Sequence, residues 1–210
     1  MHPAQRQNQK LSLIQYWKES GLIHSQKLIE AFMQIQRELF IDDFLMDQAY
    51  ADHPLPIGEG QTISQPTTIM LMIQLLEVES HHTILEVGAG SGYNAALLSL
   101  LGSKVITIER HHKVAKQAEY NLRENGCSNV TVVIGDGKLG LSNQSPFDRI
   151  IVTAAASEVP KHLKKQLGIQ GQMVLPVGPP HACQMMCLKK VNSTHYKSTS
   201  HGLFSFVPLV

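Results

Sequence analysis

Three glycines and a nearby carboxylate are the residues of this chain whose spacing most clearly indicates chemistry. Gly88, Gly90 and Gly92 follow an apolar run, and Glu86 lies two residues before the first of them. Glycines at such a turn allow unusual backbone angles and let a ligand approach the main chain closely. A dinucleotide-binding fingerprint needs G-x-G-x-x-G, but Tyr93 occupies the place of its third glycine. The spacing therefore favours a ligand other than NAD.

The carboxylate beside the glycines indicates which ligand this turn suits. An ionised Glu86 would repel a pyrophosphate and attract a cationic group. S-adenosylmethionine carries an ammonium and a sulfonium, so it fits the site better than a dinucleotide does. A plain glycine-rich turn in an α/β protein remains the alternative interpretation of these residues alone.

A strand and a helix are needed to hold the glycines at a ligand. Thr83–Val87 is typical of a buried parallel strand, and an Ala/Leu-rich segment with helical character follows the glycines. Strands and helices then alternate, which predicts an α/β fold with a doubly wound, mostly parallel sheet. Beyond this unit we expect strands at Lys104–Glu109, Val130–Ile134, Phe147–Thr153 and Gln172–Val177, helices at His112–Asn125 and Pro160–Leu167, and a closing hairpin of Gln184–Val191 with Leu203–Leu209.

The N-terminal part of the chain has a different pattern. Residues 9–40 show two or three apolar helical faces, interrupted at Gly21. Residues 51–63 contain two prolines and two glycines without periodicity, which predicts a loop. Ser64 and Pro66 are then start signals for a further helix.

Polar residues end the expected strands, where ligands of such sheets bind. Glu109 ends the second strand and can accept hydrogen bonds from two ribose hydroxyls, unless it is a surface carboxylate beside Arg110. Asp136, between Gly135 and Gly137, ends the third strand and can accept from an adenine amino group. An Asp-Gly turn explains Asp136 nearly as well.

The fourth strand end, Thr153 with the three alanines that follow, narrows the acceptor of a methyl group. Enzymes that methylate base amino groups carry an N/D-P-P-Y/F tetrapeptide here, and Thr-Ala-Ala-Ala offers no surface on which a base could stack. Methylation of pyrimidine C5 needs a cysteine nucleophile, and neither Cys183 nor Cys187 has a flanking proline. A carboxylate needs no base, because a pKa near ~4 leaves it ionised at neutral pH.

Composition limits the remaining possibilities. The net charge is +1, far from the basic balance of proteins that bind through phosphate contacts, so no nucleic-acid partner is expected. No apolar run is long enough to span a membrane and no signal peptide is visible, so we expect a cytoplasmic protein without a membrane partner. The 210 residues fit a single domain, in which an N-terminal segment, 1–80, packs on a core of 81–210.

Cysteine and histidine usage predicts no metal site. The three cysteines, Cys127, Cys183 and Cys187, have no ligand spacing and are expected to be buried free thiols. The eleven histidines include two adjacent pairs, whose side chains do not point the same way in a helix or strand.

Several motifs resemble one known family over nearly the whole chain. The sequence LPIGEGQTISQP at 55–66, ahead of LEVGAGSGY, resembles the protein-L-isoaspartate O-methyltransferases, and GQTISQP is the most specific part. The resemblance also includes RELF at 37–40, GDG at 135–137, IVTAA at 151–155, LPVG at 175–178 and FVPL at 206–209. It implies a Rossmann-like class I methyltransferase fold and a monomer that transfers a methyl group from S-adenosylmethionine, leaving S-adenosylhomocysteine. The acceptor implied is the free α-carboxylate of L-isoaspartyl residues in damaged proteins, whose ester closes to a succinimide that reopens partly to aspartate.

The resemblance also implies roles for individual residues. Ser64 matches the active-site serine, which would orient the acceptor carboxylate; its alternative role is that of a helix N-cap. The cofactor-binding residues implied are Glu86, Gly88, Ala89, Gly90, Ser91, Gly92, Glu109, Arg110, Gly135, Asp136, Gly137 and Thr153. The substrate-binding residues implied are Ile57, Thr62, Ile63, Ser64, Val207 and Pro208.

The chain departs from the family pattern at four places, Thr67, Lys138, Ala156 and Ala89, none of which removes a group that the chemistry needs. Two other functions remain as alternatives. One is a methyltransferase for small molecules or nucleic acid, and the other is a nonenzymatic module that binds the cofactor or altered peptides.

Overall fold

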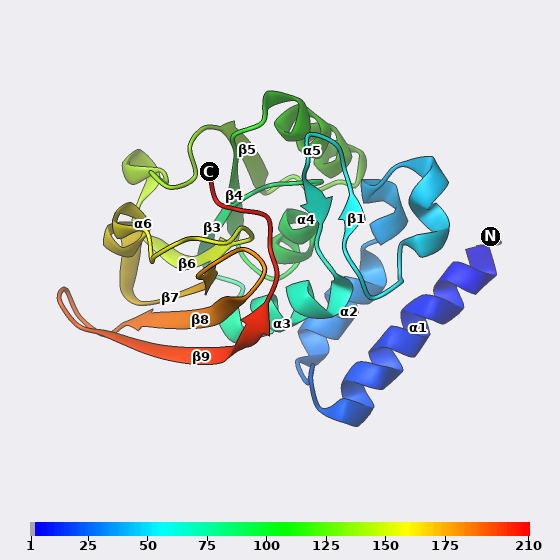
Figure 1. Cartoon of the computed structure of the whole chain (residues 1–210), viewed down its shortest axis with the longest axis horizontal. Coiled ribbons are helices and arrows are strands. Elements are labelled where there is room, and N and C mark those ends of the chain that lie inside the picture. Colours follow the sequence, from blue (N-terminus) through cyan, green and yellow to red (C-terminus); the bar gives the residue numbers. More distant parts are fainter. Residues whose placement is uncertain (1–2) are drawn as a thin grey trace.

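A seven-stranded sheet forms the centre of the protein. The structure is a computed structural model and describes residues 3–210. The strand order is β5-β4-β3-β6-β7-β8-β9, in which the first five strands run parallel and the last two add antiparallel pairs (Figure 1). The strands are β3 (Thr83–Val87), β4 (Lys104–Glu109), β5 (Val130–Ile134), β6 (Phe147–Val152), β7 (Leu167–Val177), β8 (Cys183–Lys190) and β9 (Tyr196–Phe204).

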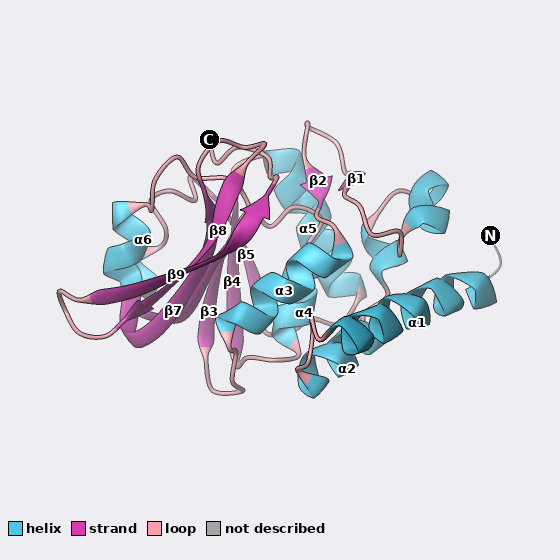
Figure 2. Ribbon diagram, turned by 60° about the horizontal axis from the view of Figure 1, so that its bottom comes forward, coloured by secondary structure: helices cyan, strands magenta, loops and turns pink. Residues whose placement is uncertain are grey.

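Helices cover both faces of this sheet, so the predicted doubly wound α/β fold is confirmed. Alternate strand residues point to opposite faces: Ile84 packs in one apolar cluster with α3 and α4, whereas Leu85 packs in the other with Leu163 of α6 (Figure 2). The helices are α1 (Pro3–Ser20), α2 (Gln26–Gln34), α3 (Pro66–Leu76), α4 (Tyr93–Ser99), α5 (His112–Glu124) and α6 (Lys161–Gln166), with 3-10 turns η1 (Arg37–Phe40), η2 (Asp43–Gln48) and η3 (Ser142–Gln144).

The N-terminal helices share the larger apolar cluster with the sheet. Trp17 of α1 is fully buried, and its ring meets Phe32 of α2 edge-on, with centroids 4.8 Å apart. The cluster continues through α3 and α4 to Val174 in β7. Among residues 3–210, no helix has both the length and the apolar character that crossing a membrane requires.

The prediction of a loop over residues 51–63 was wrong in part. Leu55–Pro56 (β1) and Thr62–Ile63 (β2) form a small antiparallel hairpin, with Leu55 opposite Ile63. Strands of two residues are too short to show alternation, and the turn between them has positive φ at Gly58, Glu59 and Gly60. The hairpin lies beside the glycine loop, above the carboxyl end of the sheet (Figure 1).

The second arm of the closing hairpin was also placed wrongly. We expected Leu203–Leu209, but β9 spans Tyr196–Phe204 and pairs with β8. Most of β9 is exposed at the sheet edge and polar, so it carries no apolar pattern. Residues 205–210 instead cross the strand ends, where Pro208 forms a parallel bridge with Ala155. This crossing brings the C-terminal segment to the site described below.

Candidate active site

The glycine loop between β3 and α4 has a backbone that glycine adopts far more readily than other residues. Gly88, Gly90 and Gly92 have φ angles of +97°, +53° and +88°. A Cβ added at Gly88 would lie 2.5 Å from Oγ1 of Thr153, which follows β6. The N–H of Gly88 also donates to the carbonyl of Ile108 at 2.8 Å, so the loop is fixed between the ends of β4 and β6.

The three glycines serve different purposes. Gly92 brings two helices together, because a Cβ there would lie 3.1 Å from Cγ of Leu122 in α5. Gly88 and Gly90 instead line a cavity above the loop. The predicted ligand approach to the main chain is thus available at the first two glycines.

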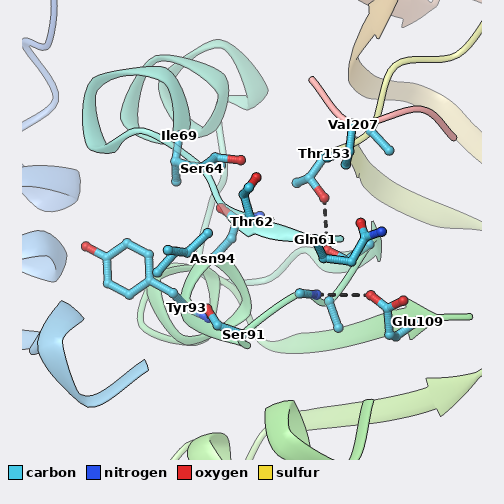
Figure 3. Close-up of a pocket in the computed structure, with 15 residues that line it drawn as sticks. Gln61, Thr62, Ser64, Ile69, Ser91, Tyr93, Asn94, Glu109, Thr153 and Val207 are labelled. Carbon is cyan, nitrogen blue, oxygen red and sulfur yellow. Dashed lines mark hydrogen bonds between the residues drawn. The ribbon is translucent and has the colours of Figure 1, made fainter. Parts of the chain in front are cut away.

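Glu109 is buried rather than a surface carboxylate, so that alternative was wrong. Its side chain is 6% exposed at the end of β4. One oxygen, Oε2, accepts from the N–H of Gly90 at 3.1 Å (Figure 3). The other, Oε1, accepts from the N–H of His111 at 3.0 Å. Each carboxylate oxygen can accept a further hydrogen bond, and Glu109 lines the cavity above the loop.

Glu86 does not lie where a ligand would touch it. It is fully buried in β3, and burial raises the pKa of its carboxyl to about 7. Its Oε1 accepts a 2.5 Å hydrogen bond from the amide of Asn94 in α4. Asn94 lines the cavity and Glu86 does not, so the carboxyl of Glu86 acts on the site through its hydrogen bond to Asn94.

Asp136 makes the turn that its Asp-Gly sequence indicated. Its Oδ1 accepts from the N–H of Lys138 at 2.9 Å, and the side chain is exposed. Gly135 donates from its N–H to the carbonyl of Glu109 at 3.0 Å. Gly137 and Arg110 line an extension of the cavity on the far side of Glu109, so the third strand end adjoins the second as expected.

Four residues separate the cavity above the glycine loop, here called the donor cavity, from a neighbouring acceptor groove. Thr62, Ser64, Thr153 and Val207 line both (Figure 3). The donor cavity is lined by Gln61, Thr62, Ile63, Ser64, Ile69, Gly88, Ala89, Gly90, Ser91, Tyr93, Asn94, Glu109, Thr153, Ala154 and Val207. The acceptor groove, of about 630 Å³, is lined by Pro54, Thr62, Ser64, Gln65, Thr67, Thr68, Thr153 and residues 203–207.

The side chain of Ser64 is free, which contradicts the N-cap interpretation. The N-cap of α3 is Gln65, whose side chain accepts from the hydroxyl of Thr68 at 3.2 Å but caps no main-chain N–H of the helix. The N–H of Thr67 is instead capped by Oδ1 of Asp52 at 2.9 Å. Within residues 3–210 the hydroxyl of Ser64 has no hydrogen-bond partner, whereas its carbonyl accepts from Arg37 Nη2 at 2.8 Å.

Three hydrogen bonds, from Thr153 and Ala155, fix the wall opposite Ser64. The hydroxyl of Thr153 donates to the carbonyls of Val87 at 3.1 Å and Gly88 at 2.9 Å. The carbonyl of Val207 accepts from the N–H of Ala155 at 2.8 Å. The C-terminal segment is thereby held against the end of β6.

Two of the expected substrate residues line neither the donor cavity nor the acceptor groove, and a third, Ile63, lines the donor cavity only. Ile57 packs over Gly90, where its Cδ1 would lie 3.5 Å from an added Cβ, and it lines a separate pocket beside Ser91. Pro208 lines the extension next to Gly137 and Arg110 instead of the acceptor groove. Neither residue contacts the groove that Ser64 lines.

Sequence analysis missed several residues of the site. Gln61 lines both the donor cavity and its extension, and Asn94 and Tyr93 line the donor cavity from α4. Asn94 directly follows the position at which a dinucleotide fingerprint would have its third glycine, which is the only signal that could have indicated it. Arg37, which bonds Ser64, carried no signal beyond its motif.

Cysteines and histidines do not gather into a site. All three cysteines are free; Cys183 is buried as expected, but Cys127 and Cys187 are partly exposed. Among residues 3–210, no group of three or more His, Cys, Asp or Glu side chains is placed to hold a metal ion.

Comparison with known proteins gives a family match over nearly the whole chain. Residues 7–210 match the family model described as Protein-L-isoaspartate(D-aspartate) O-methyltransferase (PCMT). The protein-L-isoaspartate O-methyltransferase of Protochlamydia amoebophila (strain UWE25) is 43% identical over 189 residues, which are 90% of each chain. A relative of the same name in Paracoccus denitrificans (strain Pd 1222) is 46% identical over 184 residues, 88% of this chain and 85% of its own.

Solved structures show the same architecture. One named protein-L-isoaspartate O-methyltransferase superposes with a TM-score of 0.85 at 28% identity, covering 95% of this chain and 65% of that longer chain. A putative protein-L-isoaspartate O-methyltransferase from Plasmodium falciparum, solved in complex with S-adenosyl-L-homocysteine, gives a TM-score of 0.81 at 23% identity and covers 95% of this chain and 97% of its own. This second likeness shows the fold.

Proposed function

Because the chain belongs to the protein-L-isoaspartate(D-aspartate) O-methyltransferase family, we propose that its two adjoining cavities hold the two reactants of that activity. The protein transfers the methyl group of S-adenosylmethionine to the free α-carboxylate of L-isoaspartyl residues in damaged proteins. The methyl ester then closes to a succinimide, which reopens partly to normal aspartate. The reaction is one of protein repair, and S-adenosylhomocysteine is its other product.

The observation that carries this proposal is the wall shared by the two cavities. Thr62, Ser64, Thr153 and Val207 line both the donor cavity and the acceptor groove, so a group bound on one side adjoins a group bound on the other. Methyl transfer to a carboxylate is an in-line displacement that needs oxygen, methyl carbon and sulfur aligned. Holding two reactants in such an arrangement can lower the activation free energy by roughly 7–11 kcal/mol.

The residues around the donor cavity fit S-adenosylmethionine, which supplies an electrophilic methyl group when bound. The carboxylate oxygens of Glu109 would accept from the ribose hydroxyls, since each already accepts one main-chain N–H and has a lone pair left. Gly88 lines the cavity with main-chain atoms alone, which lets a ligand approach the loop closely. The extension lined by Arg110 and Gly137 would receive the adenine.

Some of the remaining residues assigned to the cofactor line the donor cavity, and others do not. Ala89, Gly90, Ser91 and Thr153 line it and would contact the cofactor directly. Glu86, Gly92, Gly135 and Asp136 line neither cavity. We assign Glu86 to holding Asn94, and Gly92 to the packing of α4 on α5.

Ser64 is the residue that would orient the acceptor. Its free hydroxyl faces the boundary of the two cavities and can donate a hydrogen bond to a carboxylate oxygen. The acceptor is ionised at neutral pH, so no residue has to remove a proton from it. Thr62, Ile63 and Val207 would flank the isoaspartyl residue, and Ile57 and Pro208 would act from outside the groove.

We further propose that the protein works as a monomer in the cytoplasm and acts on proteins, with neither nucleic acid nor a membrane as partner. The net charge of +1 supports the exclusion of nucleic acid. Residues 1–80 and 81–210 are proposed to form one domain, and the apolar cluster that runs from α1 to β7 supports this.

Transfer of labelled methyl groups to paired peptides tests the function. The peptides differ only in carrying isoaspartate or aspartate at one position. We expect alkali-labile label on the isoaspartyl peptide alone. An alkali-stable label, or transfer to nucleic acid or small molecules instead, would support a different methyltransferase. Stabilisation by the cofactor without any transfer would support a binding module.

A further inference from the structure

Arg37 is a cation that the fold buries completely, next to the proposed site. It lies in η1 and is 0% exposed. Its Nε donates to the carbonyl of Ala49 at 2.7 Å, and its Nη2 donates to the carbonyl of Ser64 at 2.8 Å. The guanidinium carbon lies 5.0 Å from the centre of the Tyr93 ring. One side chain therefore joins η1, the residue after η2, the segment before α3 and the first residue of α4.

This arginine is held by hydrogen bonds to carbonyls, and the carboxylate of Asp52 acts on its charge only through space. Within residues 3–210 it forms no salt bridge, and its Nη1 is buried without a hydrogen-bond partner. Burial lowers the pKa of Arg37 to about 10, so the side chain is still cationic at neutral pH. Burying a cation against carbonyls and a ring, without a bonded anion, is costly. Its presence therefore indicates a task that an apolar side chain could not perform.

Arg37 bonds the main chain of Ser64, and this leaves the side chain of Ser64 available for the acceptor. The arginine holds the main chain of Ser64 through its carbonyl, while the hydroxyl of the same residue is unbonded and lines both cavities. Fixing the carbonyl fixes the direction in which the side chain leaves the backbone. A displacement of about 1 Å in a reacting geometry can lower a rate about 100-fold.

We propose that Arg37 is a positioning residue for methyl transfer, which clamps the main chain of Ser64 so that the hydroxyl meets the acceptor carboxylate. The inference rests on the proposed function. Its clamp needs two donors in a fixed fork, one for Ala49 and one for Ser64. Lysine has a single ammonium on a flexible stem, so Arg37→Lys keeps the charge and loses the clamp.

The experiment measures kcat and KM for an isoaspartyl peptide, together with the Kd for S-adenosylhomocysteine. For Arg37→Lys we expect kcat to fall about 10- to 100-fold. We also expect KM to change less than kcat and the Kd to stay within about twofold of wild type. Of the residues that line the donor cavity the arginine contacts Ser64 and Tyr93, and neither is proposed to bind the cofactor. Unchanged kcat, or a loss of cofactor affinity as large as the loss of kcat, would overturn the proposal.

Arg149→Lys is the matched control for stability. Arg149 donates from Nε and Nη2 to the carbonyl of Glu77 at 3.1 and 3.0 Å, so it also fixes main chain at an end of α3, although through one carbonyl where Arg37 joins two. We expect Arg149→Lys to lower the Tm without lowering kcat at a temperature where both variants are folded. An equal loss of kcat in Arg149→Lys would show that Arg37 acts only through stability, and would overturn the proposal.

A double-mutant cycle with Ser64→Ala shows whether Arg37 acts through Ser64. Once the hydroxyl is absent, its position no longer matters, so we expect Arg37→Lys to lower kcat by less than about twofold in the Ser64→Ala background. Additive losses would contradict the coupling. Arg37→Gln, which keeps one donor, replaces the lysine variant if that variant does not fold, and failure of both to fold would overturn a role specific to transfer. Wild-type protein inactive on the isoaspartyl peptide would refute the proposed function itself.

Discussion

The carboxylate of Glu109 accepts a hydrogen bond from the N–H of Gly90 at 3.1 Å, which joins the end of β4 to the middle of the glycine loop. Its other oxygen accepts from the N–H of His111 at 3.0 Å. One acidic residue thus both shapes the loop and lines the donor cavity beside it. Loop geometry and cofactor binding are therefore coupled through this side chain.

Replacing Glu109 by glutamine should weaken cofactor binding. Glutamine has one acceptor where glutamate has two, so its amide nitrogen would face a main-chain N–H of Gly90 or His111. Hydrogen bonds to a charged group contribute about 1.5–3 kcal/mol, which corresponds to a loss of affinity of about 10- to 150-fold. Isothermal titration with S-adenosylhomocysteine measures this loss. Glu119→Gln, on the exposed side of α5, is the control, and equal affinities of the two variants would refute the assignment of Glu109.

Removing the hydroxyl of Ser64 should lower turnover without affecting stability. The side chain makes no hydrogen bond within residues 3–210, and Asp52 supplies the cap at the start of α3. Ser64→Ala should therefore keep the Tm and the cofactor Kd of the wild type while kcat falls. Asp52→Ala is the matched comparison, because it removes the cap and should cost about 1 kcal/mol of stability. A Tm lowered as much in Ser64→Ala as in Asp52→Ala would restore the capping role.

Gly88→Ala should lower the free energy of unfolding more than alanine does at another glycine of positive φ. Gly126 has φ +70° and nothing within 4 Å of an added Cβ, so Gly126→Ala should cost about 1–2 kcal/mol from the backbone alone. At Gly88, with φ +97°, the added Cβ would also lie 2.5 Å from Thr153 Oγ1, which costs about 1–3 kcal/mol more. Urea unfolding measures both variants. Equal losses would mean that the contact with Thr153 is easily relieved.

The buried carboxyl of Glu86 predicts a pH dependence of stability. Burial raises its pKa from 4.5 to about 7, so the folded protein holds this proton more tightly than the unfolded chain does. Stability from this group therefore falls as the pH rises from about 4.5 to about 7, and the full cost of the ionised form applies above pH 7. Glu86→Gln removes the ionisation and should gain stability relative to wild type by up to about 3 kcal/mol between pH 4.5 and pH 8.

Urea unfolding of both proteins across this pH range measures the difference. Glu119→Gln is again the control, because Lys116 lowers the pKa of Glu119 and gives an effect of the opposite sign. A difference between Glu86→Gln and wild type that stays constant with pH would show that the carboxyl ionises normally.

The inner strands β3, β4 and β6 were predictable because burial on both faces leaves a continuous apolar run, and the edge strand β5 was predictable from a similar run although it is only partly buried. β3, β4 and β5 have the predicted bounds, and β6 ends one residue earlier than predicted. Two features were not predictable from periodicity. The hairpin β1–β2 has strands of two residues, and β9 is an exposed edge strand that carries no apolar pattern.

Some residues of the candidate site could likewise be predicted from the sequence, and others could not. The glycines, Glu109 and Thr153 could be predicted because motif and strand end coincide at each of them, whereas Ser64 was indicated by the family motif alone. The depth of Glu86 could not, since a sequence does not say whether a carboxylate faces the loop or lies beneath it. Arg37 contacts three segments that are distant in sequence, and Asn94 bonds a carboxylate buried under the loop. Such contacts leave no local spacing to recognise.

Conversion of an isoaspartyl peptide in the presence of the protein and S-adenosylmethionine tests the account most directly. Mass spectrometry follows the peptide, and chromatography separates its isoaspartyl and aspartyl forms. We predict a methyl ester first, then a succinimide, and then a mixture that contains the aspartyl form, while the matched aspartyl peptide gains no methyl group. A methylated product that persists without forming succinimide, or equal methylation of both peptides, would contradict the account.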